Sequence, residues 1–126
     1  MSEYANRIEA RLASWKARLT GGQRSHDVGT SDDREDSVAE LQRATQQLEV
    51  DLADLLGAAA LQAERAANFE ARAMEAIRNG DDGAAREALR TQQECVDTLA
   101  RLEADATVIR AMIAECRAVL GDGNAP

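Results

Sequence analysis

Apolar residues recur every three or four positions along two stretches of the chain, one on each side of residues 79–83. In the first stretch they are Val38, Leu41, Leu48, Leu52, Leu55, Ala59, Ala66, Phe69, Ala73 and Ala76. In the second they are Leu89, Val96, Leu99, Leu102, Ala106, Ile109, Ile113, Cys116 and Leu120. This spacing predicts two amphipathic α-helices. Because turn-forming residues join them, we expect an all-α fold, a long antiparallel two-helix coiled-coil hairpin over residues 37–120.

The ends of both helices carry their own signals. Ser37 followed by Glu40 fits a capping box, so we expect the first long helix to begin at Ser37. Gly80 stands where a left-handed residue ends a helix, and Asp81 or Asp82 can cap the next one. We expect the turn to span residues 79–83 and residues 121–126 to form a frayed tail.

Residues 1–20 form a separate unit, predicted as a short amphipathic helix. Its apolar face consists of Tyr4, Ile8, Leu12, Trp15 and Leu19. Its basic side chains are Arg7, Arg11, Lys16 and Arg18, against two acidic ones, so this segment is positive in a chain of net charge -8. Such a helix can lie in an anionic lipid interface, with these nine residues as the membrane-binding set. The same stripe can instead pack on a protein surface, on its own hairpin or on a second copy. Residues 21–36 then read as a flexible acidic linker.

A second apolar stripe follows the first long helix outside its main seam. It contains Leu56, Ala60, Ala63, Ala67, Ala71 and Met74, and Val108, Met112 and Val119 lie beside the seam of the second helix. A two-helix hairpin would leave these residues exposed, which favours self-association. We therefore expect a homo-oligomer, with Leu56, Ala60, Ala63, Ala67, Met74 and Met112 at its interface.

The chain carries no pattern typical of an enzyme. It has no Gly-rich phosphate loop, and its single histidine, His26, leaves no pair at metal-ligand spacing. We expect no catalytic residue, no metal site and no cofactor. The net charge of -8 disfavours nucleic acid as a partner.

The cysteines and the hydropathy of the chain bear on where it works. Cys95 and Cys116 lie on one predicted helix, roughly 30 Å apart, so they cannot form a disulfide within the chain. This favours a reducing cytoplasm. The sequence shows no signal peptide and no apolar run of membrane-spanning length. We expect a cytoplasmic protein that is soluble or peripheral on the inner face of the cell membrane.

The hairpin tip resembles that of the phage-shock protein A and vesicle-inducing plastid protein family. The similarity lies in the spacing of Phe69, Ala73, Ala76, Ile77 and Gly80, followed by Ala84-Ala85-Arg86-x-Ala88-Leu89. It covers about residues 60–100. Phe69 stands where the family usually has Trp, and Ala84 where it has Leu. The hairpin-tip residues singled out on this basis are Phe69, Ala73, Ile77, Gly80, Ala85, Arg86 and Leu89.

The resemblance implies a non-enzymatic, membrane-associated helical scaffold in bacterial envelope-stress protection or membrane remodelling, related to the ESCRT-III superfamily. Members also regulate a transcriptional activator ATPase through the hairpin. The chain ends with the hairpin and lacks the later helices from which that family builds its polymers. The alternative is a soluble coiled-coil adaptor or regulator that binds a protein partner.

Overall fold

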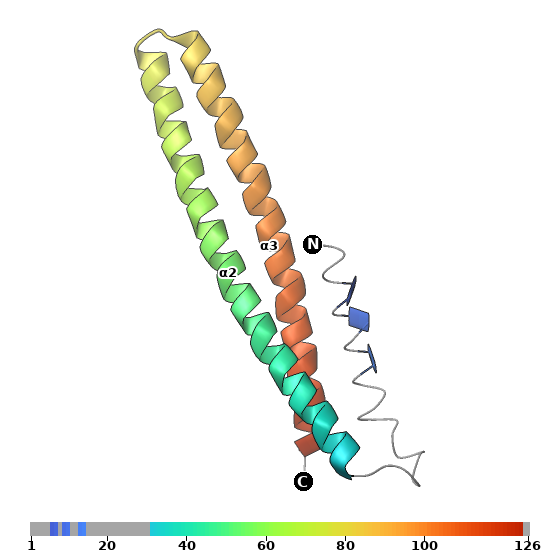
Figure 1. Cartoon of the computed structure of the whole chain (residues 1–126). Coiled ribbons are helices and arrows are strands. Elements are labelled where there is room, and N and C mark those ends of the chain that lie inside the picture. Colours follow the sequence, from blue (N-terminus) through green and yellow to red (C-terminus); the bar gives the residue numbers. More distant parts are fainter. Residues whose placement is uncertain (1–5, 8, 11–12, 15–30, 125–126) are drawn as a thin grey trace. The chain divides into compact units, whose positions relative to one another are not determined.

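Two long helices packed against each other form the described part of the chain. The computed structural model describes residues 6, 7, 9, 10, 13, 14 and 31–124, and within the two long helices it describes the side chains of residues 35–121. Helix α2 is Ser31–Arg78 and helix α3 is Asp82–Asn124, and they lie side by side (Figure 1). The predicted all-α hairpin is confirmed. Residues 6, 7, 9, 10, 13 and 14 are helical, whereas the rest of residues 1–30 lies outside the described residues.

The turn between the helices is a complete Schellman motif. Gly80 has φ of 74°, the left-handed conformation expected for it. The Asp81 amide donates to the Ala76 carbonyl at 2.8 Å and the Gly80 amide donates to the Ile77 carbonyl at 3.0 Å. The carboxylate of Asp81 accepts a hydrogen bond from the Ala84 amide at 3.0 Å, so Asp81 is the N-cap of α3. Three residues, 79–81, therefore suffice for the turn, instead of the predicted five.

Both helices are longer than the sequence predicts. Helix α2 begins at Ser31, so residues 31–36 belong to it and not to the linker. Ser37 is buried inside the helix and is not its N-cap. Acidic residues at 32, 33, 35 and 36 favour this extension, because negative charge stabilises the first turns of a helix. Helix α3 likewise continues through Gly121 to Asn124, four residues beyond the expected end.

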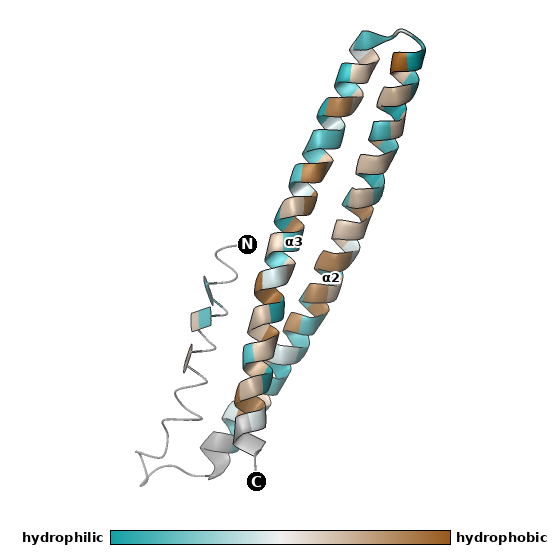
Figure 2. Cartoon of the chain, turned by 180° about the vertical axis from the view of Figure 1, so that it is seen from behind, coloured by the Kyte–Doolittle hydropathy of each residue, from teal (hydrophilic) through white to brown (hydrophobic). Residues whose placement is uncertain are grey.

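Heptad spacing organises the seam on both helices. In α2 the core positions a and d alternate without interruption from Val38 (a) and Leu41 (d) to Ala73 (a) and Ala76 (d). In α3 they run from Ala85 (a) and Ala88 (d) to Cys116 (d) and Leu120 (a). Residues at these positions are buried or half-buried throughout. In an antiparallel pair the flanking e positions of both helices lie on one side of the seam and the g positions on the other. Figure 2 shows the resulting alternation of hydrophobic and hydrophilic residues along both helices.

The chain divides into two compact units, which are described separately. The tip unit is Ala53–Ala106 and the open-end unit is Met1–Leu52 with Thr107–Pro126. The buried residues of the tip unit have small side chains: Ala59, Ala66, Ala73, Ala85, Cys95 and Ala106. The prediction that Leu89 and Val96 lie in the seam of the second helix is wrong, because both are exposed, at e positions. Ala85, Ala88, Gln92 and Cys95 occupy the seam in their place. Alanines fill much of this seam, together with the half-buried Phe69, Leu99 and Leu102.

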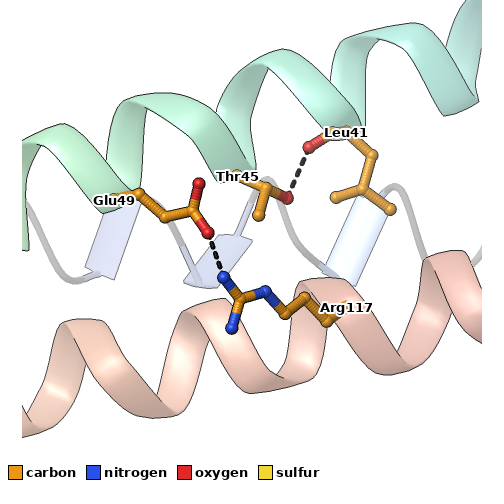
Figure 3. Close-up of polar contacts among 4 residues, drawn as sticks. All are labelled: Leu41, Thr45, Glu49 and Arg117. Atoms are coloured by element: carbon orange, nitrogen blue, oxygen red, sulfur yellow. Dashed lines mark hydrogen bonds and ion pairs between the residues drawn. The ribbon is translucent and has the colours of Figure 1, made fainter.

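The core of the open-end unit is built from larger side chains. Leu41, Leu48, Ile109 and Cys116 are fully buried. Thr45, at a seam position between the two leucines, donates its hydroxyl hydrogen to the Leu41 carbonyl at 2.7 Å, which satisfies this buried polar group (Figure 3). Glu49 and Arg117, both at e positions, form an ion pair across the two helices (Figure 3).

Met112 and Val119 differ from the sequence expectation. They were expected to be exposed beside the seam, but they are only 4% and 5% exposed. Val108, expected to be exposed with them, is 39% exposed. Met112 therefore offers no free surface for self-association in this structure, whereas the other five residues of that predicted interface do.

Candidate functional site

An exposed apolar face covers one side of the tip unit. The side chains that form it stand at e and b positions of the two helices. We call this set the tip face: Leu56, Ala60, Ala63, Ala67, Met74 and Ile77 of α2, with Leu89 and Val96 of α3. All eight are exposed. The face therefore consists of residues of both helices.

The pairing of the two helices puts these residues on the same side of the seam. Gln92, at position a of α3, donates to the Glu70 carboxylate, at position e of α2, at 3.3 Å. Val96 and Leu89 occupy the e positions that follow and precede Gln92 in the sequence. Ile77 is the next e position of α2 after Glu70. The antiparallel register therefore brings Ile77 towards Leu89 and Glu70 towards Val96.

The larger side chains of this face are strongly exposed. Ile77 is 59% exposed and Met74 is 52% exposed, in helices whose seam residues are mostly alanine. Apolar patches of this kind on a folded surface mark sites of contact with another protein or a membrane. Alanines at 60, 63 and 67 add a flat strip against which a helix can approach closely.

The opposite side of the tip unit is polar. The guanidinium carbon of Arg72, at a g position, lies 4.8 Å from the centre of the Phe69 ring. This cation–π contact covers the half-buried Phe69. The g positions of α3 in this unit are Thr91, Thr98 and Asp105, all half-buried. Among the described residues, exposed apolar side chains of both helices therefore gather on the e side of the tip unit, alongside the e-position residues Glu70 and Glu103.

The predicted hairpin-tip residues serve different purposes in the structure. Ala73 and Ala85 are buried in the seam, Phe69 is half-buried, and Gly80 forms the turn. Arg86 is exposed, and Ile77 and Leu89 are exposed on the tip face. The motif is therefore chiefly a packing and turn pattern, with only Ile77 and Leu89 contributing to a binding surface.

Two features of this site were missed from the sequence. Leu89 and Val96 were placed in the core because they are the largest apolar residues in their stretch. Continuous heptad spacing through residues 85, 88, 92 and 95 was the signal that could have moved them to the surface. Of the predicted membrane-binding residues, only Arg7 is described, and it is exposed. The other eight lie outside the described residues.

The polar chemistry of the described residues is limited. Cys95 and Cys116 are free thiols and buried. Burial raises the pKa of the Cys116 thiol above its ordinary value, with Glu115 adding to the rise and a hydrogen bond with the Thr45 side chain opposing it. Within the described part of the chain, His, Cys, Asp and Glu form no group of three that could hold a metal ion. No helix there is long and apolar enough to cross a membrane.

The comparisons with known proteins add no relative. No family model, no curated protein and no solved structure matches the chain.

Proposed function

We propose that this chain is a non-enzymatic helical scaffold that assembles with copies of itself through the tip face. The observation that carries the proposal is the row of exposed apolar side chains on one side of the tip unit. Burying them against a second hairpin would remove several partly exposed large side chains from water, each contributing on the order of 1 kcal/mol. An alanine-lined seam buries little area by itself, so association adds stability that the tip unit lacks.

Residues 1–20 are the part of the scaffold that attaches it to an anionic membrane surface. Their stripe of Tyr4, Ile8, Leu12, Trp15 and Leu19 and their four basic side chains support this part of the proposal. The likeness of the hairpin tip to the phage-shock protein A family points the same way. The process would be bacterial envelope-stress protection or membrane remodelling, from the cytoplasmic face.

Static light scattering tests the assembly. At micromolar concentration the mass should lie well above the 13.6 kDa of one chain. Ile77→Lys should lower it towards that of one chain, because a charged group buried within an apolar contact is costly. Leu61→Lys is the matched control. Leu61 is equally exposed, at 55%, and stands on the same helix, but at a c position off the tip face. A folded monomer in the unmodified protein would overturn self-association.

A soluble adaptor is the second candidate. It is favoured by the burial of Met112 and Val119. An apolar side of the open-end unit that is already covered suits a protein whose N-terminal segment contacts protein. In that case the tip face would receive a different protein, and residues 1–20 would meet protein and not lipid. A monomer that leaves anionic vesicles unbound is the result expected of the adaptor.

A further inference from the structure

The g side of the open-end unit is buried to a degree that two helices do not explain. Met112 and Val119, at g positions of α3, are 4% and 5% exposed, and Ser37, at a g position of α2, is 3% exposed. Ala44, the next g residue of α2, is half-buried. Together these four small or apolar residues line one side of the seam, and we call this lining the open-end groove.

The opposite side of the same unit shows what two helices alone achieve. There the side chains of Arg117 and Glu49 are 64% and 41% exposed, although they pair with each other. In a two-stranded coiled coil, e and g residues touch the partner helix on one flank and water on the other. Burial of Met112 and Val119 to this degree is more than two helices alone give, and it indicates that a further segment lies against them.

We propose that residues 1–20 of the same chain fill the open-end groove. Their apolar residues follow the spacing of four, four, three and four that a third helix of a bundle needs. As a helix, residues 4–19 extend about 22 Å, and the g positions of α2 from Ser37 to Asp51 extend over about 21 Å. Residues 21–30 lead directly to Ser31, the start of α2, which lies at the Ser37 end of the groove.

The charges of the groove and of the segment are complementary. The charged side chains at c and g positions of the described open-end unit are Glu40, Asp51 and Glu115, and all are acidic. Residues 1–20 carry Arg7, Arg11, Lys16 and Arg18 against two acidic side chains. By contrast, the charged side chains at e positions of this unit are Glu35, Glu49, Arg110 and Arg117, which balance one another, and Arg117 pairs with Glu49. The distribution of charge therefore favours docking of residues 1–20 on the g side, the same side that burial indicates.

This docking is independent of the tip face and of any lipid. It makes residues 1–20 an intramolecular ligand of the hairpin in water. A membrane or a partner protein that binds the same stripe must first displace it from Met112 and Val119. The open-end groove therefore competes with any membrane or partner protein for binding of residues 1–20.

Fluorescence of the full-length protein in lipid-free buffer tests the docking. Trp15 is the only tryptophan, so emission reports this segment alone. Its maximum should lie at a shorter wavelength than in the urea-unfolded chain and resist acrylamide quenching. Ala44→Arg, which places a long cation in the groove, should return both values towards those of exposed tryptophan. Ala118→Arg, at an exposed f position, is the matched control and should leave them unchanged.

Methionine oxidation gives a second readout that leaves the hairpin seam intact. Met74 is 52% exposed and serves as the internal reference for Met112. In the unmodified protein Met112 should form sulfoxide much more slowly than Met74. Leu12→Glu, a change within the segment itself, should raise the Met112 rate towards that of Met74.

Three results would overturn the proposal. The first is Trp15 emission typical of full exposure in buffer. The second is Met112 protection that Leu12→Glu leaves unchanged. The third is emission that shifts to longer wavelength on dilution, which would assign the groove to the N-terminal segment of a second copy.

Discussion

Single glycines show how local geometry decides the effect of the same substitution. Gly57 lies in the middle of α2, is exposed, and a Cβ added there would meet no atom within 4 Å. Gly80 also has open space around it, but its φ of 74° is one that residues with a side chain rarely adopt. The space around the two residues is the same, and the backbone conformation differs.

Gly→Ala changes at these two positions should therefore have opposite signs. Gly57→Ala should raise the free energy of unfolding by about 0.5–1 kcal/mol, because alanine restricts the unfolded chain and favours the helix. Gly80→Ala should lower it by about 1–2 kcal/mol through left-handed strain. Urea melts at equal protein concentration measure both. A stabilised Gly80→Ala would show that the turn can change its conformation at little cost.

The Cys116 thiol makes the free energy of unfolding depend on pH in the alkaline range. Burial raises its pKa in the folded chain above the ordinary 9.0. Below the ordinary value both states hold the proton, and the contribution of this group to stability is fully present. As pH rises above it, the unfolded chain releases the proton first, so the unfolded state gains stability. This contribution is lost as pH rises through the folded pKa.

The free energy of unfolding should consequently fall as pH rises from about 8 to about 10, and Cys116→Ala should flatten that slope. Alanine also leaves a small cavity, so the comparison concerns the slope and not the absolute value. Denaturant melts across this pH range provide it. An unchanged slope in Cys116→Ala would assign the pH dependence to other groups.

At the scale of elements, the apolar pattern of the sequence predicts the seam of α2 better than the seam of α3. In α2 every apolar position of the expected stripe is buried or half-buried, because the large residues Leu41, Leu48, Leu52 and Leu55 occupy it. From Ala85 to Cys95 the seam of α3 carries small and polar residues, whereas the larger Leu89 and Val96 are exposed. Residue size therefore does not predict the seam in this stretch, whereas heptad position does.

Adjacent residues of α3 provide a test of the seam. Ile109 is 1% exposed and Val108 is 39% exposed. Ile109→Asp should lower the free energy of unfolding by several kcal/mol, since it leaves a carboxylate unpaired in a core of apolar side chains. Val108→Asp should change it by less than about 1 kcal/mol. Helical circular dichroism and thermal melting report both. Equal effects would mean that the seam is not where the helices place it.

At the scale of the whole molecule, charge restricts how the protein can meet a membrane. The net charge is -8 although residues 1–20 are positive, so the rest of the chain is repelled by anionic lipid. The proposed attachment to a membrane would therefore use the N-terminal segment. If it also occupies the open-end groove, lipid binding and docking exclude each other.

Full-length protein should accordingly pellet with anionic vesicles, and protein lacking residues 1–20 should stay in the supernatant. Added salt should weaken the pelleting, because the cationic part of the attraction, on the order of 1 kcal/mol per basic residue, is screened. Neutral vesicles are the control. Equal pelleting with and without residues 1–20 would remove this segment from the membrane role.

The sequence by itself determined the all-α hairpin, its turn at Gly80 and the seam of α2, because periodicity and turn chemistry are local properties. It also supplied most of the tip face, from Leu56 to Met74. Tertiary structure decided that Leu89 and Val96 face outward and that Met112 and Val119 are covered. It also decided that residues 31–36 and 121–124 are helical. The physical reason is that exposure depends on what packs against a residue from elsewhere in the chain, and the size of its own side chain does not determine this.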